Sequence, residues 1–223
     1  MRILLSLSSV LAGLSASGCH LSQDLSDPQQ LQGELLQVAS KYQNWGRVDD
    51  VAHIAPQLCV ALPPPAVRYS ESTDDETHGQ KLYSVFAKDR DAYVEIAKQS
   101  SPVGQVIVKE SWIPEETSEV KPGEIDHAKL VRTGTDPNSS RFNPYAAKGG
   151  KVFKASKRGD LFIMMKLDPG TPNTDEGWVY GTVTADGKTV TSAGKVESCM
   201  KCHQDAKHDR LFGVPTWDFS RRP

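Results

Sequence analysis

Apolar side chains recur at helical spacing in one stretch that begins near residue 28. Asp27-Pro28 suits the start of a helix, because an Asp side chain caps unpaired N–H groups and Pro is tolerated in the first turn. The apolar residues that would share one side of this helix are Leu31, Leu35, Val38 and Tyr42. The spacing therefore predicts an amphipathic helix that starts at residue 28.

After residue 80 the pattern changes to short apolar runs rich in β-formers, which predict strands. These runs are residues 82–87, 106–108, 161–165, 178–183 and 189–190. A helix is expected over residues 89–99, and Asp186-Gly187 predicts a hairpin turn. Residues 114–150 are rich in Pro, Gly, Asn, Ser and charge, and indicate a long insertion. The fold class that follows is α+β, with a mainly antiparallel β-sheet and a few helices.

The N-terminus is typical of an export signal. A cationic Met1-Arg2 precedes an apolar and small-residue run over residues 3–14, which is too short to span a bilayer as a mature helix. Residues 1–18 resemble a bacterial lipoprotein signal, with cleavage before Cys19 and a lipid on its sulfur. The alternative is an ordinary signal peptide cut nearby. Either signal predicts a periplasmic location or the outer face of a bacterial membrane, and the first adds a lipid anchor.

The mature chain is predicted to be a short polar tether followed by one domain. Residues 19–27 form the tether, and residues 28–223 are long enough for one domain with a real core. A formal net charge of −2 gives no reason to expect nucleic acid as a partner.

Cys199-Met200-Lys201-Cys202-His203 reads C-x-x-C-H, the attachment signature of c-type haem. Two thiols at this spacing can each form a thioether to one edge of a porphyrin, and the imidazole that follows is held under the iron. The alternatives are a redox dithiol, which usually lies near a βαβ pattern, and half of a zinc site. The remaining candidate zinc ligands are scattered along the chain: Cys59, His53, His78, His127 and His208. We therefore expect one covalent haem c per chain, with His203 as the iron ligand.

The cysteine count fits this assignment. Of the four cysteines, Cys19 is assigned to lipid, and Cys199 and Cys202 to haem. Cys59 is left over in a mainly apolar run, where a lone thiol is most often a small buried hydrophobe.

The chain from about residue 42 to residue 212 resembles the cytochrome P-460 family and its relatives, the β-type cytochromes c′. An aromatic pair opens the match, a late strand begins with Gly and Trp, and C-x-x-C-H lies near the C-terminus. The matching segments are residues 42–45, 82–91, 104–110, 177–180, 198–203 and 209–212. The resemblance implies a sheet-based fold, unlike the all-helical fold of ordinary small cytochromes c.

The resemblance also implies a five-coordinate haem with His203 proximal and an open distal face. In cytochromes P-460 a lysine amine is bonded to the porphyrin edge, and Lys109 stands at that position. A crosslink there would distort the macrocycle and so influence the potential of the iron. The alternative for Lys109 is a solvated lysine at a strand end, beside Glu110.

The distal face decides what the haem can do. Hydroxylamine-oxidising relatives carry a distal carboxylate, and the resemblance puts Phe162 at that position, with Asp160 the nearest acid. Tyr83 stands where some relatives have a distal arginine. A phenyl ring over iron would favour uncharged gases such as nitric oxide, whereas Phe162 in plain core packing is the alternative.

Two function classes follow. One is a redox enzyme that acts on hydroxylamine or another small nitrogen species and passes electrons to a periplasmic acceptor. The other is a non-enzymatic haem protein that binds nitric oxide or transfers electrons. A homodimer is left open.

Overall fold

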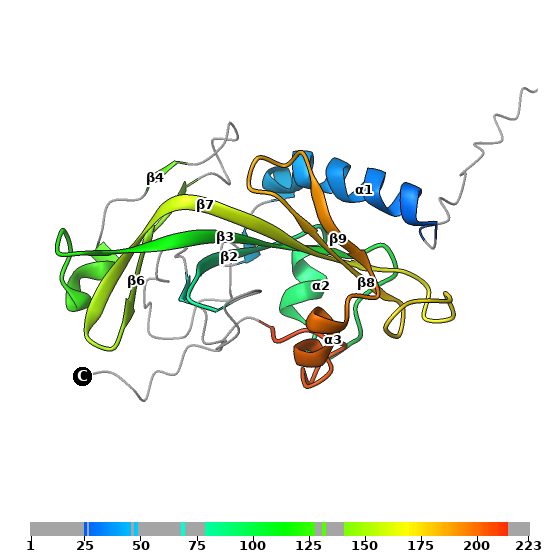
Figure 1. Cartoon of the computed structure of the whole chain (residues 1–223). Coiled ribbons are helices and arrows are strands. Elements are labelled where there is room, and N and C mark those ends of the chain that lie inside the picture. The colour runs from blue at the N-terminus through cyan, green and yellow to red at the C-terminus, as the bar shows by residue number, and fades with distance from the viewer. Residues whose placement is uncertain are drawn as a thin grey trace, which may run out of the picture.

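The computed structural model of the chain describes residues 25, 27–45, 47–48, 68–69, 79–127, 131–132 and 141–213. Within these ranges an antiparallel sheet carries helices on both faces, as Figure 1 shows. This architecture confirms the predicted α+β class with a mainly antiparallel sheet. The predicted signal segment, Cys19, Cys59, His53 and His78 lie outside the described residues.

The described helices are three α-helices and two 3-10 helices. They are α1 (Pro28–Lys41), η1 (Tyr42–Trp45), α2 (Arg90–Val94), η3 (Pro122–His127) and α3 (Glu197–His203). The strands are β1 (Arg68–Tyr69), β2 (Leu82–Ala87), β3 (Val106–Thr117), β4 (Val131–Arg132), β5 (Arg141–Phe142), β6 (Tyr145–Lys148), β7 (Lys151–Lys166), β8 (Trp178–Val183) and β9 (Val190–Gly194).

The main sheet has the order β1-β2-β3-β7-β8-β9, and β6 also pairs with β7. Every pairing among the described strands is antiparallel. β4 and β5 form a separate small pair. The hairpin predicted at Asp186-Gly187 joins β8 to β9, and Gly187 adopts the positive φ of 73° that its turn requires.

The structure differs from the sequence prediction in the length of two strands. β3 runs on from the predicted residues 106–108 to Thr117, and β7 begins ten residues before the predicted residue 161, at Lys151. The extra length forms an arm with β6, to the left in Figure 1. Charged cross-strand partners support the arm, such as Lys151 with Glu116 at 2.7 Å. Ala146, Phe153 and Ala155 of the arm also join a small apolar cluster, but they are spread singly among charged residues, so no apolar run marks the arm in the sequence.

The predicted helix over residues 89–99 is also shorter than expected. α2 ends at Val94, and residues 95–98 continue as turns. Asp89 caps its start by accepting a hydrogen bond from the Ala92 N–H at 2.9 Å. Tyr93 and Ile96 are buried, whereas Ala97, which would share their side of a longer helix, is exposed.

α1 covers one face of the sheet. Asp27 accepts from the Gln29 N–H at 2.8 Å, which confirms the predicted helix start. The predicted apolar side of α1 packs on alternate residues of β3, β7 and β8, in a cluster that includes Val108, Ile163 and Val179. Gly181 permits this close approach, because a Cβ there would lie 2.5 Å from the Leu35 methyl groups. This layer is the main hydrophobic core.

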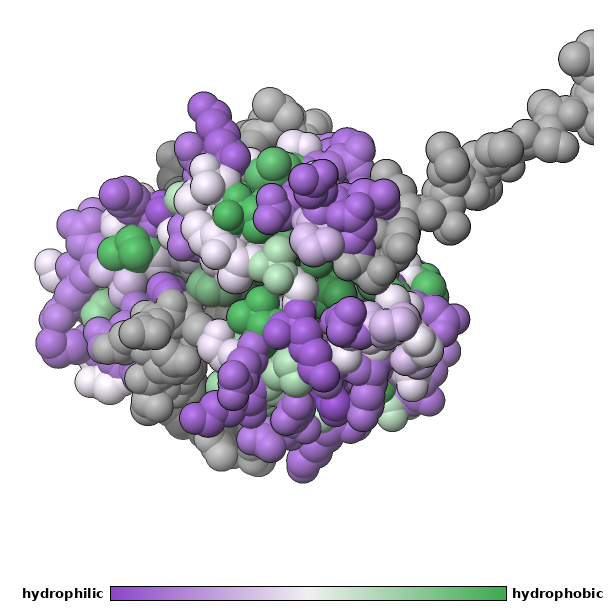
Figure 2. All heavy atoms as spheres, turned by 45° about the vertical axis from the view of Figure 1, so that its right-hand side comes forward, coloured by the Kyte–Doolittle hydropathy of each residue, from purple (hydrophilic) through white to green (hydrophobic). Residues whose placement is uncertain are grey.

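The opposite face of the sheet has its own core, against which α3 and α2 pack. Ile107, Met164, Trp178 and Tyr180 point from the strands into this cluster, and Cys199 and Met200 of α3 pack against it. Figure 2 shows hydrophilic side chains over most of the visible surface, with smaller hydrophobic areas between them. Among the described residues, no helix is long and apolar enough to cross a membrane.

Candidate functional site

The C-x-x-C-H stretch forms α3, a helix that the sequence pattern had not indicated. Cys199 and Cys202 are three positions apart, so the helix places both thiols on one side. Cys199 is half-buried against the sheet and Cys202 is exposed, and neither is in a disulfide. Burial raises the pKa of the Cys199 thiol, although a hydrogen bond with Ser198 opposes that shift.

His203 ends α3 with its ring held on several sides. Its Nδ1 lies 2.7 Å from the backbone carbonyl oxygen of Arg210. A carbonyl only accepts, so Nδ1 carries the proton, and in the neutral ring the lone pair is on Nε2. The imidazole also packs between the rings of Tyr180 and Phe212, at centroid distances of 5.7 and 5.3 Å.

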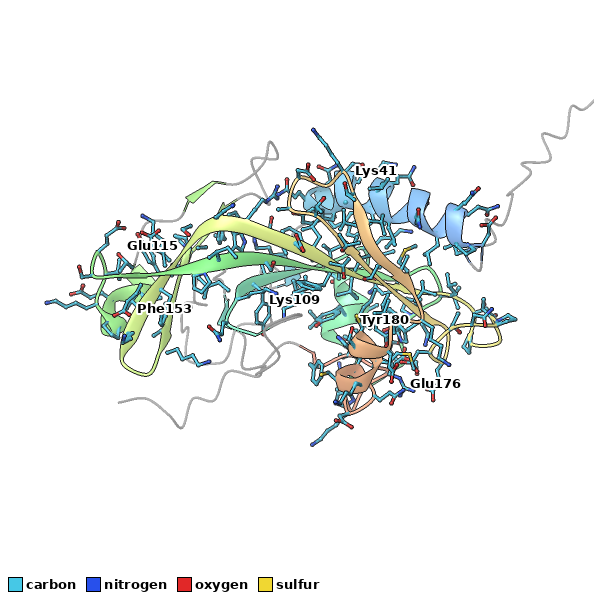
Figure 3. The ribbon with its side chains drawn as sticks, in the orientation of Figure 1. Lys41, Lys109, Glu115, Phe153, Glu176 and Tyr180 are labelled. Atoms are coloured by element: carbon cyan, nitrogen blue, oxygen red, sulfur yellow. The ribbon has the colours of Figure 1, made fainter. Side chains whose placement is uncertain are left out.

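The surroundings of His203 favour its neutral, metal-binding form. Burial lowers the pKa of His203, the hydrogen bond with the Arg210 carbonyl opposes this, and the positive charge of Lys109 lowers the pKa further. The last effect means that Lys109 lies within electrostatic reach of His203. Lys109, labelled in Figure 3, shares one face of β3 with Ile107, and α3 packs against the cluster of Ile107. The two predicted site residues, 94 positions apart in the sequence, therefore lie on the same side of the sheet.

Lys109 lies in the interior of β3, between Val85 on β2 and Phe162 on β7. The alternative of a lysine at a strand end does not describe it, because β3 continues for eight residues beyond it to Thr117. Its Nζ lies 4.0 Å from the centroid of the Tyr83 ring. Burial, and then the nearby charge of Lys81, lower the pKa of Lys109 to about 8. A larger share of this amine is therefore neutral near physiological pH than for an ordinary lysine.

Phe162 and Tyr83 flank Lys109, so the sheet brings together the two residues predicted for the distal side and the lysine predicted for the porphyrin edge. Phe162 pairs directly with Lys109 across the strands, and the Nζ of Lys81 lies 5.2 Å from its ring centroid. Phe162 is half-buried and belongs to none of the buried core clusters. Plain core packing therefore does not describe this ring.

Asp160, the acid nearest to Phe162 in the sequence, lies at an irregularity between β3 and β7. Glu110 pairs with Leu161, and the next pair is Trp112 with Arg158, so β7 has one extra residue there. The Asp160 carbonyl accepts a hydrogen bond from the Ser111 hydroxyl at 2.6 Å, which helps to hold this bulge.

Glu110, the neighbour of Lys109, points to the opposite face of the sheet. It is fully buried and accepts hydrogen bonds from Tyr42 at 2.8 Å and from Arg158 at 2.6 Å. Arg47 reaches its other oxygen at 3.4 Å. This cluster joins the end of α1 to the sheet directly behind Lys109, and burial together with the Glu110 charge raises the pKa of Tyr42 well above its usual range.

A second charged cluster near His203 was missed by sequence reasoning. Asp175 accepts from Arg210 through two bonds of 3.0 Å and from the Tyr180 hydroxyl at 2.7 Å. Asp209 accepts from Lys166 at 2.8 Å and from the Trp178 indole at 3.1 Å. The matches over residues 177–180 and 209–212 lie near this cluster, but they did not indicate which partners the Asp175 and Asp209 side chains would find.

The donor set suits a haem. α3 presents two free thiols on one side, and the residue that follows them is a histidine whose Nε2 carries the lone pair. In the described ranges, no three His, Cys, Asp or Glu side chains gather into a separate metal site. Cys199, Cys202 and His203 are therefore the residues that would hold the group.

Comparison with known proteins agrees with this donor set. The family model described as Cytochrome P460 matches residues 65–212, more than half of the chain. No curated protein gives a significant match. The matched region contains β2, β3, β7, β8 and α3, which carry Lys109, Phe162, Tyr83 and the C-x-x-C-H stretch. The chain belongs to the cytochrome P460 family, and this membership implies a haem cofactor.

Proposed function

We propose that this protein is an exported c-type cytochrome that performs redox chemistry on small nitrogen species such as hydroxylamine or nitric oxide. One haem would be held by thioethers from Cys199 and Cys202, with His203 as its axial ligand. The haem would supply an iron that binds a small molecule and exchanges electrons with it. Membership of the family and the C-x-x-C-H helix support this proposal.

The observation that carries the proposal is the position of Lys109. It faces the same side of the sheet as α3, its charge reaches His203, and burial with Lys81 lowers its pKa to about 8. A neutral amine has the lone pair that a bond to carbon requires, whereas an ammonium has none. We infer that Lys109 is bonded to the edge of the porphyrin.

Such a bond replaces one N–H of Lys109 and one C–H of the ring by an N–C bond. Two protons and two electrons leave in the process, so a two-electron oxidant such as a peroxide must accept them. In the finished protein Lys109 would tie β3 to the macrocycle, while Cys199 and Cys202 tie it to α3. The ring would then be held from both sides, which limits its movement in the site.

The aromatic neighbours of Lys109 favour a second candidate function. Tyr83 and Phe162 flank the amine, and neither is a carboxylate that could take a proton from hydroxylamine at neutral pH. A protein with such a distal side would bind nitric oxide or transfer electrons without turning over hydroxylamine. This alternative keeps the same haem ligands and differs only in the chemistry of the distal side.

The proposed partners follow from export. The N-terminal segment would carry the chain out of the cytoplasm, and a lipid on Cys19 would anchor it at the outer face of a membrane. Electrons from the iron would pass to a periplasmic acceptor. Globomycin, which blocks lipoprotein signal cleavage, tests the anchor: the precursor should accumulate in treated cells, and normal processing would contradict the lipid.

The optical spectrum of the mature protein tests the crosslink. A ferrous Soret band shifted strongly to the red is expected, because the added amine changes the macrocycle. Lys109→Leu should return this band to that of an ordinary haem c. Lys88→Leu is the matched control, since it removes an exposed lysine just after β2 and leaves Lys109 and its neighbour Lys81 unchanged. Tryptic mass spectrometry should find the haem joining the Lys109 peptide to the peptide with Cys199 and Cys202, and an unmodified Lys109 would exclude the bond.

The thioethers need a separate test. The double substitution Cys199→Ala and Cys202→Ala should abolish covalent haem, because both bonds to the thiols are lost. His203→Ala should leave the thioethers but change the coordination of the iron. Thioether-linked haem in digests of the double variant would overturn the assignment.

A further inference from the structure

The proximal ring of His203 is held by a tight turn with an unusual conformation. His208 to Leu211 form a β-turn, closed by the Leu211 N–H donating to the His208 carbonyl at 2.8 Å. The two central residues both have positive φ, 48° for Asp209 and 66° for Arg210. This is the pattern of a type I′ turn, which ordinarily takes Asn and Gly at these positions.

Arg210 is a costly residue for that position. A non-glycine residue in the left-handed region is strained, because its Cβ approaches the following carbonyl. Such strain persists only where the surroundings over-determine the conformation. The carbonyl of Arg210 accepts the Nδ1 proton of His203, so this strained residue directly contacts the proposed iron ligand.

Two carboxylates fix the turn: Asp175, which is buried and binds Arg210, and Asp209, which is partly buried and lies in the turn itself. The Asp175 carboxylate accepts two hydrogen bonds of 3.0 Å from the Arg210 guanidinium, and the Tyr180 hydroxyl donates to the same carboxylate at 2.7 Å. Glu176 adds a contact to Arg210 at 3.1 Å, although it is largely exposed. Figure 3 shows Tyr180 and Glu176 close to α3.

Asp209 is fixed from the other side. Its carboxylate accepts from Lys166 at 2.8 Å, from the Trp178 indole at 3.1 Å and from the Ser101 N–H at 2.9 Å. These donors come from β7, from β8 and from the loop before β3, which are parts of the rigid sheet layer. Both central side chains of the turn are therefore tied to elements outside it.

We propose that Asp175 and Asp209 are positioning residues for the proximal ligand. They hold the turn so that the Arg210 carbonyl accepts from Nδ1 of His203, which fixes the tautomer and increases the electron donation of the imidazole to iron. A more basic imidazole stabilises the ferric state, so this network keeps the reduction potential low. The inference rests on the proposed function, because it requires His203 to be the axial ligand.

The test compares the Fe–His stretching frequency and the reduction potential of the haem-loaded protein with those of variants. Asp175→Asn removes the negative charge that binds the Arg210 guanidinium. Asp209→Asn removes the negative charge that binds Lys166. Both should shift the Fe–His stretch to lower frequency and the potential to a more positive value. Asp186→Asn, in the exposed hairpin turn after β8, should change neither.

Tyr180→Phe provides a second test of the proposal in case an aspartate variant does not fold. It removes one of the bonds to Asp175 but retains the ring that packs on His203, so a smaller shift in the same direction is expected. An unchanged Fe–His stretch and potential in Tyr180→Phe and in every folded aspartate variant would overturn the proposal. A parent protein without any Fe–His203 band would overturn the proposed axial ligand as well, so the two failures are distinguishable.

Discussion

The Nζ of Lys109 lies 4.0 Å from the centroid of the Tyr83 ring, on the neighbouring strand. A lysine ammonium over an aromatic face is attracted by the ring, by about 0.5–2 kcal/mol, so the nitrogen of Lys109 is held there before it loses its proton. Lys109 has four rotatable side-chain bonds, so this attraction restricts where its nitrogen can go. Tyr83 therefore positions the amine that we propose to bond to the haem edge.

Replacing the ring should slow the crosslink. Tyr83→Leu removes the aromatic face, and should slow crosslinking severalfold, because the nitrogen of Lys109 is no longer held over a ring before it is deprotonated. Tyr83→Phe keeps the ring and should crosslink at nearly the parent rate. The fraction of haem joined to the Lys109 peptide after a fixed exposure to peroxide measures this. Equal rates in Tyr83→Leu and the parent would show that the ring has no part in positioning.

The buried cluster behind Lys109 should matter for stability. Glu110→Gln leaves Arg47 and Arg158 facing an uncharged amide, with Arg47 only 2% exposed. Removing one partner of a buried ion pair typically costs about 3–5 kcal/mol. Glu116→Gln is the control, because its bond to Lys151 is exposed and should contribute about 1 kcal/mol or less. Urea unfolding of the three proteins gives the comparison, and equal losses for both variants would contradict this role of Glu110.

Asp175 should make stability depend on pH in the acid range. Burial raises the pKa of Asp175, but the bonds from Arg210 and Tyr180 outweigh burial and hold the pKa below its usual range. The unfolded chain therefore binds more protons than the folded chain in this range. The contribution of Asp175 is complete above the ordinary aspartate pKa of about 4, and is lost as the pH falls below that value.

The difference in unfolding free energy between the parent and Asp175→Asn should thus be constant above about pH 5 and should shrink below about pH 4. Denaturant unfolding at a series of pH values measures it. Asp205→Asn, an exposed position just after α3, provides a matched control for the loss of one carboxyl group. A difference that grows as the pH falls would have the wrong sign for this mechanism.

The elements with local apolar patterns could be predicted from the sequence. The spacing of Leu31, Leu35 and Val38 indicated α1, and the β-rich runs gave β2 and β8 with the bounds that the structure has. These signals are local, because the apolar residues that each element buries recur along its own short stretch of sequence. The arm of β3, β6 and β7 was missed because backbone pairing, exposed charges and a few scattered apolar residues support it, and none of these leaves an apolar run.

The candidate site was only partly predictable for the same reason. The C-x-x-C-H motif is complete within five consecutive residues, so the sequence alone identifies it. The family resemblance pointed to Lys109. The pairing of Lys109 with Phe162 depends on the register between β3 and β7, and the two residues are 53 positions apart in the sequence. The bonds of Asp175 to Arg210 span 35 positions. No single-sequence pattern specifies such pairs, because tertiary packing sets them.

Substitution of Phe162 tests whether the distal side supports the oxidation of hydroxylamine. This ring lies beside Lys109, and the ammonium of Lys81 is 5.2 Å from its centroid. A carboxylate introduced there would face a positive charge, which favours its ionised form. An ionised carboxylate is the general base that hydroxylamine oxidation requires at the distal side.

In the crosslinked protein, Phe162→Glu should therefore raise hydroxylamine oxidation by about a hundredfold or more, the usual contribution of a positioned base. Phe162→Gln has the same length without a base, and should stay near the slow rate of the parent, while nitric oxide should bind to the ferrous form of all three proteins. The rate of hydroxylamine oxidation, measured with an artificial electron acceptor, distinguishes the parent from the two variants. Fast turnover by the parent would show that a base already serves the distal side, and Asp160 would be the first residue to substitute in the search for it.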